Sequence, residues 1–233
     1  VLVDIAFHAR PGTVTAIVGP SGSGKTTIAR LISRFWDVDS GAVMVDGVDI
    51  RELGTEQLMS RLSMVFQDVY LFDDSLIANI RVGRPDASDE EVFRAADLSG
   101  VTSIANRLGW HTPVGEGGRL LSGGERQRVS VARALLKQAP IVLFDEATSA
   151  LDAENEANIL AAMDELREQS TFIVIAHKLD TIKSADQIVV LDEHGQVSQL
   201  GTHSELSDVP GIYRHFWQQR KAASGWKISS GRD

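Results

Sequence analysis

A glycine-rich loop between an apolar strand and a helix is the feature that most narrows what this chain can fold into. Residues 14–18 read Val-Thr-Ala-Ile-Val and predict a short buried strand. The loop comes directly after it, as Gly19, Pro20, Ser21, Gly22, Ser23, Gly24, Lys25 and Thr26. After Thr27 apolar residues recur at helical spacing, which predicts a helix. A strand, this loop and a helix, in that order, predict a phosphate-binding α/β domain.

The residue types of the loop specify its chemistry. Glycines let backbone N–H groups approach phosphate oxygens, and the following helix directs the positive end of its dipole at the same charge. Lys25 is expected between the β and γ phosphates of a nucleotide, and Thr26 is expected to offer its hydroxyl to Mg²⁺. We therefore predict a nucleotide and Mg²⁺ as ligands, with residues 19–27 as nucleotide-binding residues.

Two acidic residues come after a second apolar run, which covers residues 141–144. A carboxylate at the end of a buried strand orients Mg²⁺ in phosphate-loop enzymes, and Asp145 is the candidate for that role. Hydrolysis also needs an acceptor for a proton of the attacking water, and the adjacent Glu146 is the candidate general base.

The rest of the chain predicts a parallel α/β sheet interrupted by helices. Residues 1–5, 63–66, 141–144, 172–176 and 188–191 read as strands, and residues 42–50 read as a hairpin around an Asp46-Gly47 turn. Residues 75–137 have a helical pattern, and residues 154–166 and 211–221 read as further helices. The fold class is therefore α/β with a small antiparallel part and an inserted helical part.

Composition excludes several other functions. The chain has 233 residues and no cysteine, which rules out disulfides, thiolate zinc sites and cysteine nucleophiles. Its net charge of −9 argues against a nucleic-acid partner. No apolar stretch reaches the ~18 residues that a membrane helix needs. The first residue is not Met, so we expect a piece of a longer polypeptide.

The stretch Leu121, Ser122, Gly123, Gly124 and Glu125 lies between these motifs. By itself it predicts a capping box, because Ser122 stands three residues before Glu125 at a helix start. Together with the phosphate loop and Asp145-Glu146, it makes the chain resemble the ATP-binding cassette (ABC) ATPases over about residues 5–220. The resemblance implies a P-loop NTPase core of the RecA-like type, residues 1–67 and 138–205, a helical subdomain over about 72–137, and a C-terminal helix and tail over 206–233.

The resemblance also implies a partner and its contacts. Two such domains, identical or different, would pair head to tail, so that residues 121–125 of one domain face the phosphate loop of the other. Ser122, Gly123 and Gly124 would then form a second anion site at a helix start, supplied in trans. Most family members have Gln where this chain has Glu125, and a carboxylate accepts hydrogen bonds but does not donate them.

Further site residues are implied by the same resemblance. Gln67 matches the family residue that touches Mg²⁺ or the attacking water. Asp152 matches a residue at the dimer seam, and His177 matches the histidine that contacts the γ phosphate. The predicted catalytic set is Glu146, His177, Gln67 and Lys25, and the predicted metal set is Thr26, Gln67 and Asp145.

Residues 112–118 resemble a loop of exporter-type transporters, in which this loop and the Gln67 loop hold a transmembrane domain. The sequence as a whole resembles those of actinobacterial siderophore half-transporters. The expected function is ATP hydrolysis that powers transport, at the cytoplasmic face of the cell membrane.

The adenine-stacking aromatic residue of the family lies upstream of Val1, so we expect weak ATP binding. Two alternatives remain open: a soluble ABC ATPase outside transport, and a regulatory half with little turnover.

Overall fold

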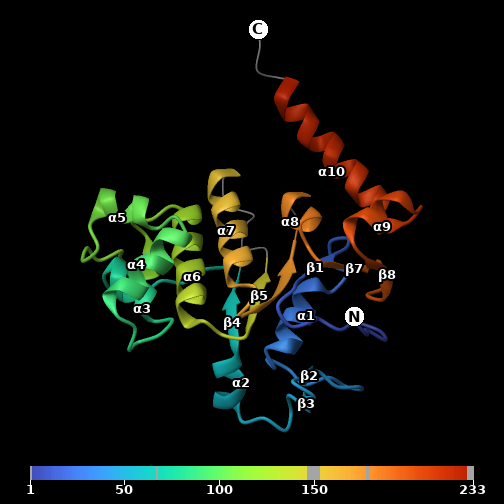
Figure 1. The fold of residues 1–233 in the computed structure, drawn as a ribbon, viewed down its shortest axis with the longest axis horizontal. Helices are drawn as coiled ribbons and strands as arrows, with labels where there is room; N and C mark the ends of the chain where they lie inside the picture. Colours follow the sequence, from blue (N-terminus) through green and yellow to red (C-terminus); the bar gives the residue numbers. More distant parts are fainter. Residues whose placement is uncertain (1, 67, 146–152, 177–178, 230–233) are drawn as a thin grey trace.

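The fold is built on a six-stranded sheet in the order β4-β5-β6-β1-β7-β8. The computed structural model describes residues 2–66, 68–145, 153–176 and 179–229. The strands β4 (Leu62–Val65), β5 (Ile141–Asp145), β6 (Thr171–Ile175), β1 (Val14–Val18) and β7 (Gln187–Leu191) pair in parallel, and β8 (Val197–Gly201) pairs antiparallel to β7 at the edge. Figure 1 shows the sheet in the middle of the molecule, with helices on both sides. The predicted α/β architecture is confirmed.

Successive side chains of the central strands point to opposite faces of the sheet and pack into two hydrophobic cores. Val14, Ala16 and Val18 belong to the core on one face, and Ile17 belongs to the core on the other. The first core continues into α3 (Leu76–Arg81), α4 (Asp89–Leu98), α5 (Thr102–Leu108), α6 (Gly123–Lys137) and α7 (Ala153–Leu166). The second core contains α1 (Lys25–Ile32) and α2 (Thr55–Arg61).

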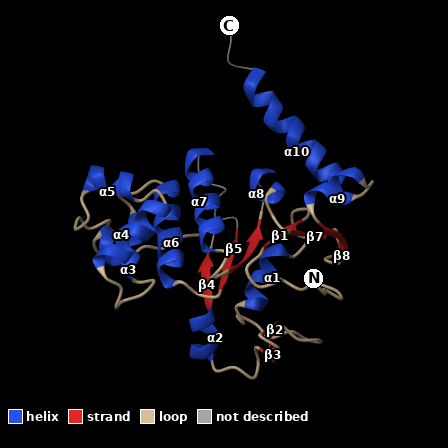
Figure 2. Cartoon of the chain, in the orientation of Figure 1, coloured by secondary structure: helices blue, strands red, loops and turns tan. Residues whose placement is uncertain are grey.

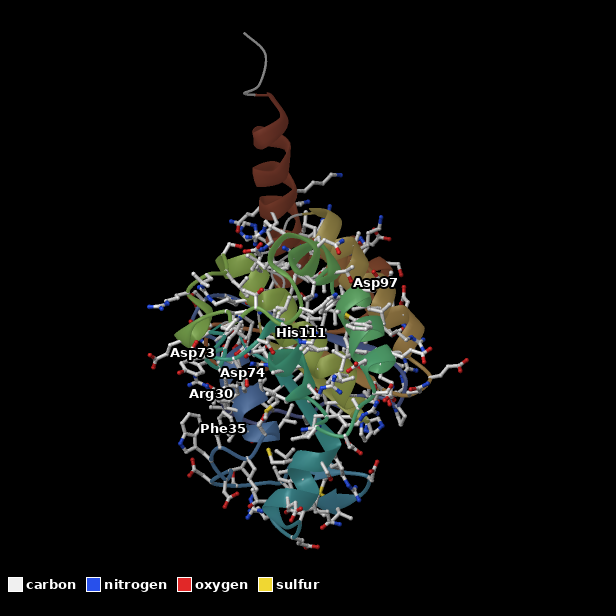
Figure 3. The ribbon with its side chains drawn as sticks, turned by 90° about the vertical axis from the view of Figure 1, so that its left-hand side faces the viewer. Arg30, Phe35, Asp73, Asp74, Asp97 and His111 are labelled. Carbon is white, nitrogen blue, oxygen red and sulfur yellow. The ribbon has the colours of Figure 1, made fainter. Side chains whose placement is uncertain are left out.

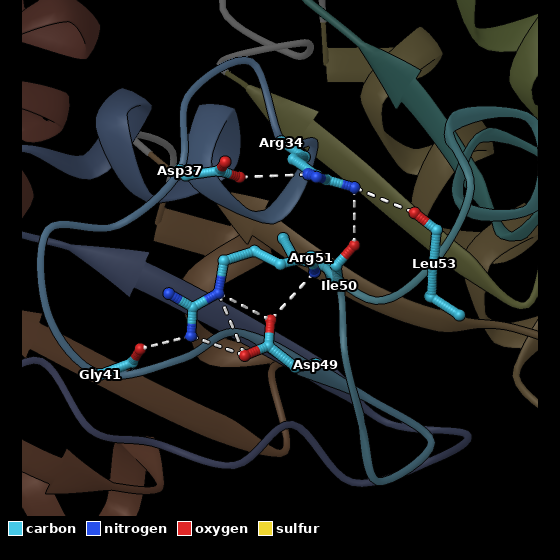
Figure 4. A network of polar contacts seen from close by, with 7 residues as sticks. All are labelled: Arg34, Asp37, Gly41, Asp49, Ile50, Arg51 and Leu53. Atoms are coloured by element: carbon cyan, nitrogen blue, oxygen red, sulfur yellow. Dashed lines mark hydrogen bonds and ion pairs between the residues drawn. The ribbon is translucent and has the colours of Figure 1, made fainter.

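The predicted hairpin is present as β2 (Met44–Val45) and β3 (Val48–Asp49), paired antiparallel. Asp46 and Gly47 at its turn have φ of 52° and 77°. A two-residue type I′ turn requires positive φ at both of these positions. Figure 4 shows how the neighbouring segment is tied to the end of α1. Arg34 donates to the carbonyl oxygens of Ile50 and Leu53 at 3.0 and 2.9 Å.

The helices after β4 form a group of their own, on the left of Figures 1 and 2, in which α6 packs against α3, α4 and β4. The chain ends with α8 (Leu179–Lys183), α9 (His203–Asp208) and α10 (Ile212–Ser229). Over the described part of the chain, no helix has the length and apolar character needed to cross a bilayer.

The predicted strand at the N-terminus is wrong for residues 2–5. The backbone N–H of Val3 bonds Gly195 O at 3.1 Å, but Asp4 has a φ of 50°, which interrupts an extended chain. Residue 1 lies outside the described residues. A segment with alternating apolar residues forms a strand only if a neighbouring strand pairs with it over several residues. Strand β8, which follows Gly195, pairs with β7 and not with residues 2–5.

Candidate functional site

The phosphate loop joins β1 to α1 with the backbone that such a loop needs. Gly22 and Gly24 have φ of 84° and 92°, which glycine adopts at little cost. A Cβ on Gly19 would lie 2.8 Å from Leu191 O and from Ser23 Oγ, so only glycine fits there. Because Gly19, Gly22 and Gly24 have no side chains, a ligand in the loop can approach the backbone N–H groups closely.

Two polar side chains of the loop suit an anion. The buried ammonium of Lys25 donates to the carbonyl oxygens of Gly19 and Pro20 at 3.0 and 2.7 Å. The hydroxyl of Ser23 is buried and finds no hydrogen-bond partner among the residues that the structure describes, which is costly unless a ligand provides one. Phosphate oxygens would accept from both groups, so the loop fits a nucleotide.

The structure brings together two of the three predicted metal-binding residues. Thr26 is the second residue of α1 and Asp145 ends β5, yet the Thr26 hydroxyl donates to Asp145 Oδ1 at 3.2 Å. Both lie where parallel strands end, the edge at which α/β sheets bind ligands. Oxygen donors are what Mg²⁺ prefers, so this pair fits the predicted ion.

Four other predicted site residues are not placed. Gln67, Glu146, Asp152 and His177 lie outside the described residues, so their roles stay predictions. The elements that lead to them are described: β4 ends at Val65, β5 at Asp145 and β6 at Ile175. These strands pair side by side, with Asp145 in register with Ile175.

The predicted capping box at the start of α6 is confirmed. The Ser122 hydroxyl accepts from Glu125 N–H at 3.3 Å, and Glu125 Oε2 accepts from Ser122 N–H at 2.7 Å. Burial acts to raise the pKa of Glu125, but the Ser122 N–H and Arg107 outweigh it and lower this pKa below its usual value. Leu121, just before the box, is buried in the core. The glycines at the start of α6 have N–H groups for which the helix itself supplies no acceptor.

Helix α6 is bonded to the chain on both sides of residue 67. The Gln127 amide donates to Phe66 O at 3.1 Å, and Arg133 donates to Tyr70 O at 2.9 Å. Arg133 also donates to Asn79 O at 2.6 Å, and its burial lowers its pKa to about 10. Helix α6 is therefore hydrogen-bonded to the chain immediately before residue 67 and three residues after it.

Sequence reasoning missed Gln127 and Arg133. A signal was present for Gln127, because it shares one helical face with the buried Val131 and Leu135. A polar residue on a buried face needs a partner, and the Phe66 carbonyl is that partner. Nothing comparable marked Arg133, whose acceptors lie far away in the sequence.

The two loops expected to hold a membrane domain lie against each other. Val114 N–H donates to Asp74 O at 2.9 Å, and Leu76 N–H donates to Thr112 O at 3.2 Å. Tyr70 and Phe72, in the segment after residue 67, are more than half exposed. Phe35 is half exposed as well, and Figure 3 shows it on the same edge of the molecule as Asp73 and Asp74.

Comparison with known proteins agrees with this geometry. The model of the family described as "ABC transporter" matches residues 2–149. The ATP-dependent lipid A-core flippase of Legionella pneumophila (strain Paris) is 47% identical over 220 residues, which are 94% of this chain and 37% of the flippase. The mycobactin import ATP-binding/permease protein IrtB of Mycolicibacterium thermoresistibile is 48% identical over 232 residues, 99% of this chain and 40% of that protein.

A solved structure of a bacterial Atm1-family ABC exporter with ATP bound superposes with a TM-score of 0.90 at 44% identity, and the match covers 94% of this chain and 38% of that one. The chain thus spans about two fifths of the length of these relatives. The chain belongs to the ABC transporter family, as a nucleotide-binding domain of the exporter type.

Proposed function

We propose that this chain hydrolyses ATP with Mg²⁺ and that hydrolysis powers transport by a longer protein of which it is the nucleotide-binding domain. The observation that carries the proposal is the contact of Thr26 with Asp145 beside the Lys25 loop. At one edge of the sheet it brings together the Lys25 ammonium, the Thr26 and Asp145 oxygens that suit Mg²⁺, and the N-terminus of α1. That combination is suited to the β and γ phosphates of a nucleotide.

Each residue has a physical task in this proposal. Residues 19–27 hold the phosphates through N–H groups, the Lys25 ammonium and the Ser23 hydroxyl. Thr26 and Asp145 would hold Mg²⁺, with Gln67 as a further ligand. Bound Mg²⁺ neutralises charge that develops on the phosphate oxygens. Glu146 accepts the proton of the attacking water, and His177 contacts the γ phosphate.

Two such domains complete each other in the proposal. The start of α6, with Ser122, Gly123 and Gly124, faces the γ phosphate bound to the partner, and Asp152 lies at the seam between the domains. Helix N–H groups and the dipole favour an anion at that place. Since α6 holds Phe66 and Tyr70 by hydrogen bonds, closure of the pair would move the Gln67 segment.

A membrane domain is the proposed second partner. The loop of residues 112–118 and the segment after Gln67 would contact it, through the exposed Tyr70 and Phe72. Relatives that match this chain over about two fifths of their length include a flippase and an import permease. On this basis we propose that the domain works at the cytoplasmic face of the membrane. Similarity to the mycobactin importer supports a siderophore as the cargo.

The test is ATPase activity of the chain and of its Glu146→Gln variant. We expect turnover to fall at least about 100-fold, since a general base contributes that much, while ATP binding in a calorimetric titration is retained. Glu168→Gln, an exposed carboxylate after α7, is the matched control and should leave turnover unchanged. Wild-type turnover by the Glu146→Gln variant would overturn the assigned base. No turnover by the unaltered chain would favour the regulatory alternative.

A further inference from the structure

The start of α6 carries an acidic residue where the proposed function needs positive potential. Glu125 is the third residue of the helix, and its pKa is lowered, so it is ionised at neutral pH. If the start of α6 faces the triphosphate of a partner, as the proposed function holds, this carboxylate repels the ligand. An uncharged Gln at this position would not repel the ligand.

The structure supplies a counter-charge from another helix. Arg107, in the last turn of α5, forms an ion pair with Glu125 Oε1, while Oε2 accepts from Ser122 N–H. Both carboxylate oxygens are therefore engaged within the subunit. The Glu125 side chain is only 16% exposed and that of Arg107 is 53% exposed, so the guanidinium is the more accessible member of the pair.

We propose that Arg107 is a positioning residue for the nucleotide site in trans: it neutralises Glu125 and holds that carboxylate back in its capping box. The pair then presents no net charge to the partner's phosphates, as a Gln would. The inference rests on the proposed function, because it has meaning only where the start of α6 meets a nucleotide.

The experiment uses the Glu146→Gln chain, in which ATP is expected to hold the dimer together, and monitors dimer formation by sedimentation during a titration with ATP and Mg²⁺. Arg107→Ala leaves an unpaired carboxylate. It should raise the ATP concentration for half-maximal dimerisation about fivefold per site, which corresponds to ~1 kcal/mol. The defect should be larger at low salt, because screening weakens charge repulsion.

The double variant Arg107→Ala with Glu125→Gln tests whether Arg107 acts by neutralising Glu125. With the carboxylate gone no counter-charge is needed, so the ATP requirement should return to that of the starting chain. Glu125→Gln alone should need no more ATP than the starting chain. The matched control is Arg84→Ala, since Arg84 pairs in the same way with Glu91 in the capping box of α4. It should not change the titration.

A purely structural role gives a different result. Thermal unfolding should show similar losses for Arg107→Ala and Arg84→Ala, whereas rescue of dimerisation by Glu125→Gln is expected only from charge neutralisation. An unchanged titration of Arg107→Ala, or a double variant as impaired as the single one, would overturn the inference. A starting chain that stays monomeric at every ATP concentration would instead remove the proposed function, and the inference with it.

Discussion

Helices α4 and α6 begin with the same device and differ in the residues of their first turn. Both start with a Ser and Glu capping box, Ser88 with Glu91 and Ser122 with Glu125, and both glutamates pair with an arginine. Between Ser and Glu, α4 has Asp89 and Glu90, whereas α6 has two glycines. The acids of α4 complement its own dipole. The glycines of α6 leave that place to an anion from outside.

Capping and ligand binding are therefore separable at one helix start. The box alone stabilises a helix, because it satisfies two backbone donors at its end. An anion site needs in addition that the two residues between the Ser and the Glu carry no side chains that would occupy it. Substitutions that convert one helix start into the other test this separation.

Gly123→Asp gives α6 the start that α4 has, and we expect the largest effect from it. Within the described part of the chain, a Cβ at this position would meet the Arg126 guanidinium at 4.0 Å and nothing nearer, and an acid in the first turn suits the dipole. Thermal stability should be kept or slightly raised, while ATPase activity should fall about 100-fold or more, as for the loss of an oxyanion site. The reverse change, Asp89→Gly, should lower stability by about 1 kcal/mol and leave ATPase activity intact. Parallel losses of stability and activity in Gly123→Asp would contradict the comparison.

Removing the caps has a smaller effect. Ser122→Ala and Ser88→Ala should each lower the free energy of unfolding by about 1 kcal/mol in urea titrations. Only Ser122→Ala should also lower ATPase activity, by severalfold, because its hydroxyl is part of the proposed anion site. Equal activity of the two variants would show that Ser122 acts only as a cap.

The smallest effect concerns pH. The pKa of Glu91 is lowered by Ser88 and Arg84, and that of Glu125 is lowered by Ser122 and Arg107 despite burial, from the same usual value of 4.5. Each ionised carboxylate therefore stabilises the fold above about pH 4.5, and this contribution is lost as the pH falls from there through the lowered pKa. Stability should fall less steeply below pH 5 in Glu91→Gln and in Glu125→Gln than in the unaltered chain. Urea titrations over pH 3–6 measure this, and a variant as acid-sensitive as the unaltered chain would count against the ion pair in question.

The sequence predicted those features that depend on neighbours in the chain. The phosphate loop, the Asp46-Gly47 turn and the Ser122 box are local: the residues that cause each of them lie within a few positions. The contact of Thr26 with Asp145 spans 119 positions, yet the sequence implied it, because both residues end up where parallel strands end.

Features that depend on tertiary placement were not predicted. Arg107 reaches Glu125 only because α5 packs beside the start of α6, and no local pattern records that. Arg133 reaches Tyr70 across 63 positions for the same reason. The expected strand at residues 2–5 failed because a strand depends on its partner as much as on its own residues.

The central claim is that residues 121–125 of one chain complete the nucleotide site of another. A mixture of two inactive variants tests it directly: Lys25→Ala lacks the loop cation, and Gly123→Asp blocks the start of α6. If sites form between chains, mixed dimers contain one site with both changes and one site with neither. Equal mixing should then restore about a quarter of the unaltered ATPase activity, because half of the dimers are mixed and each has one intact site. A mixture no more active than the average of its two components would contradict the claim.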